Sequence, residues 1–278
     1  MSQYQTLEIE HRNGVATLWM NRPEVFNAFN EQLIDELGAA CQALDADAQV
    51  RVVVLAGRGK NFSAGADLNW MKRAAECSQE DNYADAMKFS SMLRGLSEMS
   101  KPTIARVQGA ALGGGTGLTA ACDMAVAADN AFFATSEVKF GIMPSVISPY
   151  VLRAIGPRQA YRYFQTAERI SATRACEIGL VHEVAPLDAI DAKIDEIVQA
   201  ILIGGPLAQK ASKDLIRAVV GQPIAEAVST ETARRIAALR STPEAKEGFA
   251  AFLEKRPAAW APPQPLESSG SPKSPKSH

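Results

Sequence analysis

Apolar and polar residues alternate in short blocks along the N-terminal part of the chain. An apolar run from Val15 to Met20 follows the pair Asn13-Gly14, the favoured turn of a two-residue hairpin, and a first strand is predicted around residues 7–9. After Asn30, which can cap a helix, apolar residues recur at helical spacing between positions 33 and 44. The chain therefore begins with a predicted β-hairpin followed by a helix.

Three later apolar runs are short and continuous, which is typical of strands buried on both faces. They cover residues 52–55, 103–107 and 124–128. Between them lie a loop over residues 57–67, a polar helical region that reaches Met99, and a glycine-rich turn followed by a helix. This alternation of strands and helices predicts a largely parallel sheet flanked by helices, and hence an α/β fold.

The pattern changes after Ser171. Residues 171–177 read as a capped helix and residues 180–184 as a short strand. From Pro186 to Arg256 nearly every segment is predicted to be helical. Three prolines stand where helices are expected to begin: Pro206, Pro223 and Pro243.

These patterns divide the 278 residues into three parts. Residues 1–185 are expected to form the α/β core, and residues 186–256 a helical region for packing and oligomerisation. Residues 257–278 are rich in Pro, Ser and Lys and are expected to be a disordered tail.

Composition excludes several classes of partner. A net charge of −2 and a pI near 6.0 give no support for binding to nucleic acid or to an acidic membrane surface. The chain start lacks the features of a secretory signal, and Asp123 and Asp129 interrupt the longest low-charge stretch, so no membrane span is expected. The four cysteines lie far apart without a CxxC pair, which suggests neither a zinc site nor disulfides. A reducing cytoplasm or organelle matrix fits this usage, and a cytoplasmic location is the prediction.

The most informative stretch is residues 109–118, which contains three consecutive glycines, Gly113-Gly114-Gly115. Each glycine weakens a helix or strand by ~0.5–1 kcal/mol relative to alanine, so the run suggests that bare N–H groups must approach something. A helix is predicted to start in or just after the triplet, which would aim its N–H groups and dipole at an oxygen atom.

A second backbone loop, residues 62–68, follows an earlier predicted strand. In a parallel sheet both loops would lie at the carboxyl ends of strands, where α/β proteins bind ligands. Two converging N–H groups can stabilise a developing oxyanion, and the same residues also fit a pair of tight, well-packed turns. The sequence contains no nucleotide-binding pattern and no nucleophile elbow, and His182 is expected to be a solvated or packed strand residue and not a triad base.

Five motifs occur in an order that matches one family. They cover residues 27–30, 62–68, 108–118, 121–123 and 136–141. Together they resemble the enoyl-CoA hydratase/isomerase (crotonase) family over residues 5–256, and this combination is far more specific than any one motif. The resemblance implies a crotonase-like ββα superhelix core and assembly as a homotrimer or homohexamer.

The resemblance also implies a chemistry. Family members bind acyl-CoA thioesters, and the N–H groups of Ala66 and Gly114 would hold the thioester oxygen while an enolate forms. Glu137 would be the catalytic acid/base, with a pKa raised by burial. No separate cofactor is implied, since coenzyme A is part of the substrate. The residues implied along the substrate are Ala64, Gly65, Ala66, Asp67, Leu68, Asn69, Gly114 and Gly117.

One position departs from the family pattern. The first of the two glutamates of family hydratases is replaced by Gly117, and Thr116 can hydrogen-bond a water but cannot act as a base near pH 7. With Glu137 alone, two reactions stay open: hydration of a 2-enoyl-CoA, or a Δ3,Δ2-enoyl-CoA isomerisation. A third possibility is a homologue that binds acyl-CoA or RNA without turnover.

Three segments favour hydration. Residues 63–71, 136–139 and 147–151 resemble the bacterial methylglutaconyl-CoA hydratase branch, which serves leucine degradation and also accepts glycine at the first acid position. Residues 147–150 are expected to reshape the acyl pocket, and Asp123 is expected to tie down the glycine-turn helix. Candidate cations for the CoA phosphates are Arg22, Lys60, Lys72, Arg73 and, from a neighbouring subunit, Lys255.

Overall fold

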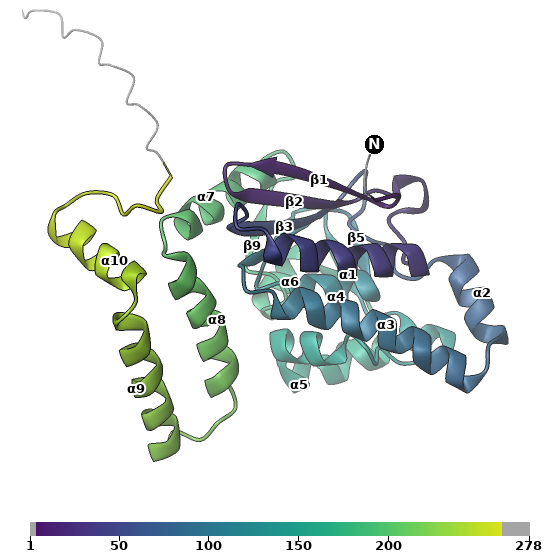
Figure 1. The fold of residues 1–278 in the computed structure, drawn as a ribbon. Coiled ribbons are helices and arrows are strands. Elements are labelled where there is room, and N and C mark those ends of the chain that lie inside the picture. Colours follow the sequence, from purple (N-terminus) through teal and green to yellow (C-terminus); the bar gives the residue numbers. More distant parts are fainter. Residues whose placement is uncertain (1–3, 263–278) are drawn as a thin grey trace, which may run out of the picture.

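The computed structural model describes residues 4–262, and its main sheet has six strands in the order β1-β2-β3-β4-β6-β9 (Figure 1). β1 and β2 form the predicted antiparallel hairpin, and every other neighbouring pair is parallel, so the parallel sheet is confirmed. The strand bounds are β1 (Leu7–Arg12), β2 (Val15–Met20), β3 (Val52–Gly57), β4 (Thr103–Val107), β6 (Met124–Ala128) and β9 (Glu183–Ala185).

A smaller second sheet was not predicted. It consists of β5 (Ala110–Leu112), β7 (Phe132–Ala134) and β8 (Ile170–Ser171), with β5 parallel to β7 and β8 antiparallel to β7. Strands of two or three residues are too short to show a period, so no hydrophobic pattern identifies them. β5 comes directly before the glycine triplet and therefore sets the direction from which that triplet enters its helix.

Helices cover both faces of the main sheet, as the continuous apolar strands predict. One face packs against α1 (Glu31–Ala46) and α3 (Gln79–Glu98), and Asn30 caps α1 by accepting a hydrogen bond from Leu33 N at 2.9 Å. The opposite face packs against α7 (Ile190–Leu202). The remaining helices of this part are α2 (Leu68–Glu76), α4 (Gly114–Ala121), α5 (Ser148–Thr166) and α6 (Ala172–Glu177).

Three C-terminal helices form an arm that extends to the left of the core in Figure 1. They are α8 (Pro206–Val219), α9 (Glu226–Arg240) and α10 (Pro243–Leu253). Pro206 and Pro243 start their helices as predicted. Pro223 does not start a helix, because it lies in the turn that follows α8, and the N-cap of α9 is Ala225. A proline shortly after a helix end is a common stop, which explains the misplaced start.

Two other expectations differ from the structure. Within the expected strand over residues 180–184, only the last two residues belong to β9, because Leu180 N and Val181 N instead bond Ala175 O in a turn after α6. The expected tail begins with ordered residues: Trp260 Nε1 donates to Ile203 O at 3.1 Å. Residues 263–278 of that tail lie outside the described residues.

Over residues 4–262, no helix combines the length and apolar character needed to cross a lipid bilayer.

Candidate active site

The two loops predicted to bind the substrate through backbone N–H groups, residues 62–68 and 109–118, lie against each other. Ser63 N donates to Ala110 O at 3.0 Å, and Leu112 N donates to Ser63 O at 2.9 Å. The loop after β3 and the segment after β4 are therefore joined by an isolated parallel β-bridge between Ser63 and Ala111. This pairing fixes the distance between the first loop and the glycine triplet.

Ala66 is placed by a similar pairing with Phe29. Phe29 N donates to Gly65 O at 2.7 Å, and Asp67 N donates to Phe29 O at 2.8 Å. This parallel pattern uses the groups on either side of Ala66 and directs its own N–H away from Phe29. Ala66 is exposed, and its N–H has no acceptor among residues 4–262.

Gly114 is the first residue of α4, where helical N–H groups lack an intrahelical partner. Gly113 N donates to Ala134 O at 2.8 Å, whereas Gly114 N–H finds no acceptor in the described part of the chain. A Cβ on Gly114 would lie 2.8 Å from Phe29 Cε2 and 2.9 Å from Phe89 Cζ. The aromatic ring of Phe29 leaves room only for a glycine at position 114. Phe29 therefore contacts both residues whose N–H groups are free, Ala66 and Gly114.

Glu137 begins a 3₁₀ helix (Glu137–Phe140) beside the glycine triplet. A Cβ on Gly113 would lie 3.2 Å from Glu137 Oε1, so the carboxyl group sits next to the start of α4. Oε2 is buried and has no hydrogen-bond partner in the described residues. Burial raises the pKa of Glu137, which suits a group that exchanges protons nearer neutral pH.

The space next to Gly117 is filled. A Cβ on Gly117 would lie 2.3 Å from Ile147 Cγ2 and 2.8 Å from Ile147 Cβ, and Ile147 is only 2% exposed. Ile147 therefore occupies the place where a side chain at position 117 would project from α4. Where the family pattern has a second carboxylate, this chain has an apolar side chain.

Thr116 holds the backbone together and does not face a water. Its buried hydroxyl lies 2.7 Å from Ala111 O and 3.2 Å from Ala134 O. A hydroxyl has a single proton to donate, and these two carbonyls of β5 and β7 accept it. The expectation that Thr116 could bind a catalytic water is therefore corrected.

Asp123 directly follows the C-cap of α4 and anchors that end of the glycine-turn helix. Its Oδ2 accepts hydrogen bonds from Thr103 N at 2.8 Å and from Lys213 Nζ at 2.6 Å. The carboxylate therefore ties the end of α4 to the start of β4 and to α8.

The predicted substrate-lining stretch lies at the start of α2. Asp67 caps this helix by accepting from Asn69 N at 2.9 Å, and its other oxygen accepts from Arg22 at 3.1 Å. Burial acts to raise the pKa of Asp67, but these hydrogen bonds outweigh it and the pKa is lowered. Leu68 is 74% exposed, which leaves the surface beside Ala66 open to a ligand.

The candidate cations for the CoA phosphates separate into two groups. Arg22 bonds Asp67 and Ala28 O, and Arg73 binds both oxygens of Glu31 at 2.6 and 2.7 Å. Three exposed lysines have ammonium groups without a hydrogen-bond or ion-pair partner among residues 4–262: Lys60, Lys72 and Lys255. These lysines stay the available candidates.

Asn27 positions one of these loops, a role that the sequence pattern did not indicate. Asn27 is fully buried with φ of 54°, and its Nδ2 donates to Arg58 O and Asn61 O, both at 2.9 Å. Ser63 Oγ donates to Asn27 O at 2.8 Å, so this asparagine supports the loop that carries Ala66. Asparagine tolerates positive φ better than most residues. An asparagine at the start of the motif over residues 27–30 is therefore the feature of the sequence that could have indicated this turn.

Comparisons with known proteins agree on one family. The family model described as enoyl-CoA hydratase/isomerase matches residues 10–263. The chain is 35% identical over 257 residues to a crotonyl-CoA hydratase of Syntrophomonas wolfei, covering 92% of this chain and 97% of that protein. It is 34% identical to a short-chain-enoyl-CoA hydratase of Clostridium acetobutylicum, covering 89% and 94%.

A solved structure is similar throughout. The crystal structure of an enoyl-CoA hydratase from Shewanella pealeana has a TM-score of 0.90 and 40% sequence identity to this chain. The likeness covers 93% of this chain and 97% of that one.

Proposed function

Because the chain belongs to the enoyl-CoA hydratase/isomerase family, we propose that the free N–H groups of Ala66 and Gly114 bind the thioester oxygen of a 2-enoyl-CoA. The enzyme is an enoyl-CoA hydratase, a hydro-lyase. The observation that carries the proposed mechanism is the arrangement of two unpaired N–H groups around Phe29 with a buried, unpartnered carboxyl nearby. Paired backbone donors are suited to the negative charge of an enolate.

The mechanism follows from this arrangement. Polarising the carbonyl makes C3 electrophilic, so water can add there while negative charge moves to the thioester oxygen. The carboxylate of Glu137 accepts a proton from that water and returns a proton to C2, which balances the addition of H and OH. Since Ile147 fills the space beside Gly117, one carboxyl group performs both transfers.

For the acyl group we propose 3-methylglutaconyl-CoA, within leucine degradation in the cytoplasm. The support is the motif resemblance over residues 63–71, 136–139 and 147–151, together with the apolar side chain of Ile147 that fills the space beside Gly117. An apolar wall at that place accommodates a branched carbon better than a second carboxylate would.

A second candidate reaction is the Δ3,Δ2-enoyl-CoA isomerisation. It is favoured by the same single carboxyl, because moving a proton between C2 and C4 needs one acid/base and no water. Both reactions use the oxyanion donors equally, so the donors do not discriminate between them.

Three substrates separate these reactions: crotonyl-CoA, 3-methylglutaconyl-CoA and a 3-enoyl-CoA. We expect the absorbance of the conjugated enoyl thioester to fall with the first two, fastest with 3-methylglutaconyl-CoA. A rise in that absorbance with the 3-enoyl-CoA and no change with the others would establish the isomerase instead. Binding of all three without any change would mean an acyl-CoA-binding protein without turnover.

We further propose that the enzyme is a homotrimer or homohexamer. In α8 and α9 no residue is buried, and large apolar side chains are exposed along the arm. They include Leu207, Ile216, Val220, Ile224, Phe252 and Leu253. Light scattering should give three or six times the chain mass of 29.8 kDa, and a mass of one chain would contradict the proposal.

A further inference from the structure

A cavity of about 680 Å³ lies between α8 and the core, apart from the site described above. Ala66, Gly114 and Glu137 do not line it. Much of its wall is apolar, with contributions from Pro102, Ala120, Met124, Leu180 and Ile216. Binding sites for small molecules commonly combine such walls with a few convergent polar groups.

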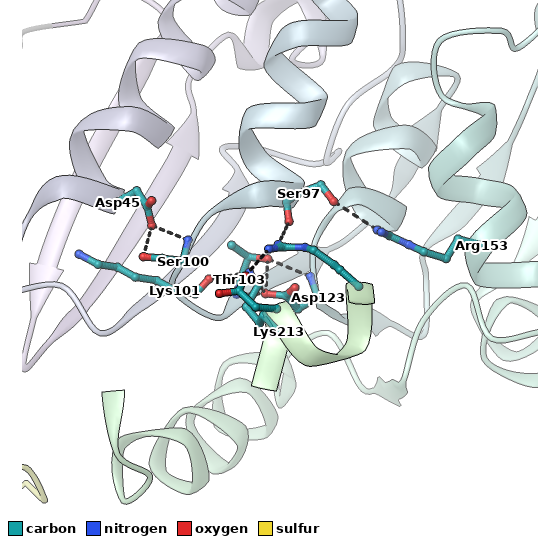
Figure 2. Close-up of polar contacts among 10 residues, drawn as sticks. Asp45, Ser97, Ser100, Lys101, Thr103, Asp123, Arg153 and Lys213 are labelled. Carbon is teal, nitrogen blue, oxygen red and sulfur yellow. Dashed lines mark hydrogen bonds and ion pairs between the residues drawn. The ribbon is translucent and has the colours of Figure 1, made fainter. Parts of the chain in front are cut away.

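Two guanidinium groups converge on one neutral residue in this cavity. Arg217, on α8, donates to Ser97 O at 2.6 Å, and Arg153, on α5, donates to Ser97 Oγ at 3.3 Å. Figure 2 shows Arg153 and Ser97 joined in this way at the end of α3. One guanidinium group can bind two oxygens of the same carboxylate or phosphate. Arg153 has no carboxylate partner within residues 4–262.

The lining of the cavity carries an excess of positive charge. Asp123 is the one carboxylate in the lining formed by the described residues, and Lys213 binds it at 2.6 Å (Figure 2). Asp214 pairs with Arg217 at 3.2 Å but does not line the cavity. Arg153 therefore has only neutral partners, the Ser97 hydroxyl and the Tyr150 ring at 5.8 Å, whereas Arg217 bonds the Ser97 carbonyl and is also paired with Asp214. Arg153 is thus the cation of the lining that lacks an anionic partner.

We propose that this cavity binds an organic anion, a carboxylate or phosphate headgroup on a short apolar chain. Arg153 and Arg217 hold the headgroup beside Ser97, and the apolar wall takes the chain. A purely structural role would be capping of the last turn of α3, whose carbonyls attract cations. That role explains the bonds to Ser97 but needs neither a second guanidinium nor the open cavity before it.

Calorimetry of the whole protein with four probes tests the proposal: octanoate, octyl phosphate, inorganic phosphate and octanol. We expect octanoate or octyl phosphate to bind with a Kd on the order of 1 mM or tighter. The tighter of the two identifies the headgroup. Octanol and inorganic phosphate should bind at least about 10-fold more weakly, because each lacks one half of the recognised chemistry.

Variants tie the binding to this cavity. Arg153→Gln should weaken the better probe about 10-fold, and Arg153→Gln with Arg217→Gln should abolish it. Arg158→Gln, at an exposed position of α5 beyond the kink at Gly156, is the matched control and should bind normally. Thermal melting shows that each variant is folded, and Arg153→Gln should turn over crotonyl-CoA at the wild-type rate.

The decisive control separates this cavity from the acyl-CoA site. Saturating butyryl-CoA, which has no double bond to hydrate, should leave the affinity of the probe unchanged. The proposal is overturned if neither amphipathic probe binds, if the double variant binds like the control, or if butyryl-CoA displaces the probe. None of these results bears on hydration, which the enoyl-CoA assays measure separately.

Discussion

Replacing Glu137 by Gln is expected to lower the turnover of crotonyl-CoA by about 10²–10⁴. The amide keeps the shape of the side chain beside Gly113 but can neither accept a proton from water nor return one to C2. Initial rates at saturating substrate measure the loss. Glu183→Gln, at an exposed position on β9, is the matched control and should keep the wild-type rate. Wild-type turnover in Glu137→Gln would remove Glu137 from the mechanism.

The same substitution should make the protein more stable near neutral pH. Burial raises the pKa of Glu137 above its ordinary value of 4.5, so the folded state favours the protonated form. The group stabilises the fold relative to its ionised form below pH 4.5, and this contribution is lost as pH rises through the raised pKa. Glu137→Gln removes that pH-dependent loss, so its melting temperature should exceed the wild-type value at pH 8 and approach it at low pH. An equal difference at both pH values would contradict the linkage.

The turnover rate of the wild-type enzyme should also depend on the ionisation of Glu137. Hydration begins with Glu137 as a carboxylate, so turnover should fall as pH drops through a pKa above 4.5. The inflection should be absent from the residual activity of Glu137→Gln.

Introducing the missing acid by Gly117→Glu is expected to destabilise the protein by about 3 kcal/mol or more and to lower activity. The new side chain would collide with Ile147, whose Cγ2 lies 2.3 Å from a Cβ at that position. Overpacking of this kind costs about 1–3 kcal/mol, and burying an unpartnered carboxylate adds to it. Urea unfolding of the purified variant measures the loss.

A double-mutant cycle shows whether Ile147 is the cause. Ile147→Gly alone should cost about 2–5 kcal/mol through the cavity it leaves. Gly117→Glu with Ile147→Gly should be more stable than the sum of the single effects predicts, by about 0.5–3 kcal/mol. Additive losses would show that the two side chains do not compete for the same space. If the folded double variant also hydrates crotonyl-CoA faster than Ile147→Gly does, the missing acid limits the present rate.

Local patterns in the sequence determined much of this fold. The bounds of β4 and β6, the hairpin turn, the Asn30 cap and the start of α4 near the glycine triplet all follow from neighbours along the chain. Continuous apolar strands also predicted a sheet covered on both faces, and the two clusters of buried residues confirm it. Each of these features depends on residues a few positions apart, whose spacing selects one backbone conformation.

Contacts between distant segments decided the rest. Thr116 and Asp123 are polar residues in or next to the helix that follows the glycine triplet, but both have structural partners. Thr116 donates to a backbone carbonyl, and Asp123 accepts from a backbone amide and from a lysine that folding brings close. The short strand β5 forms because it pairs with β7, about twenty residues further along the chain, and Ser63 adds a bridge to it from the other direction.

The glycine at position 117 shows this division most clearly. This glycine can be read from the sequence, but the reason for it is Ile147, thirty residues further on, which takes the space of a side chain. A hydrophobic pattern records only whether a residue is buried, whereas close packing decides which two buried residues compete for one volume. For this protein, the sequence indicates that one acid is absent, and only the tertiary structure shows that nothing could replace it without moving Ile147.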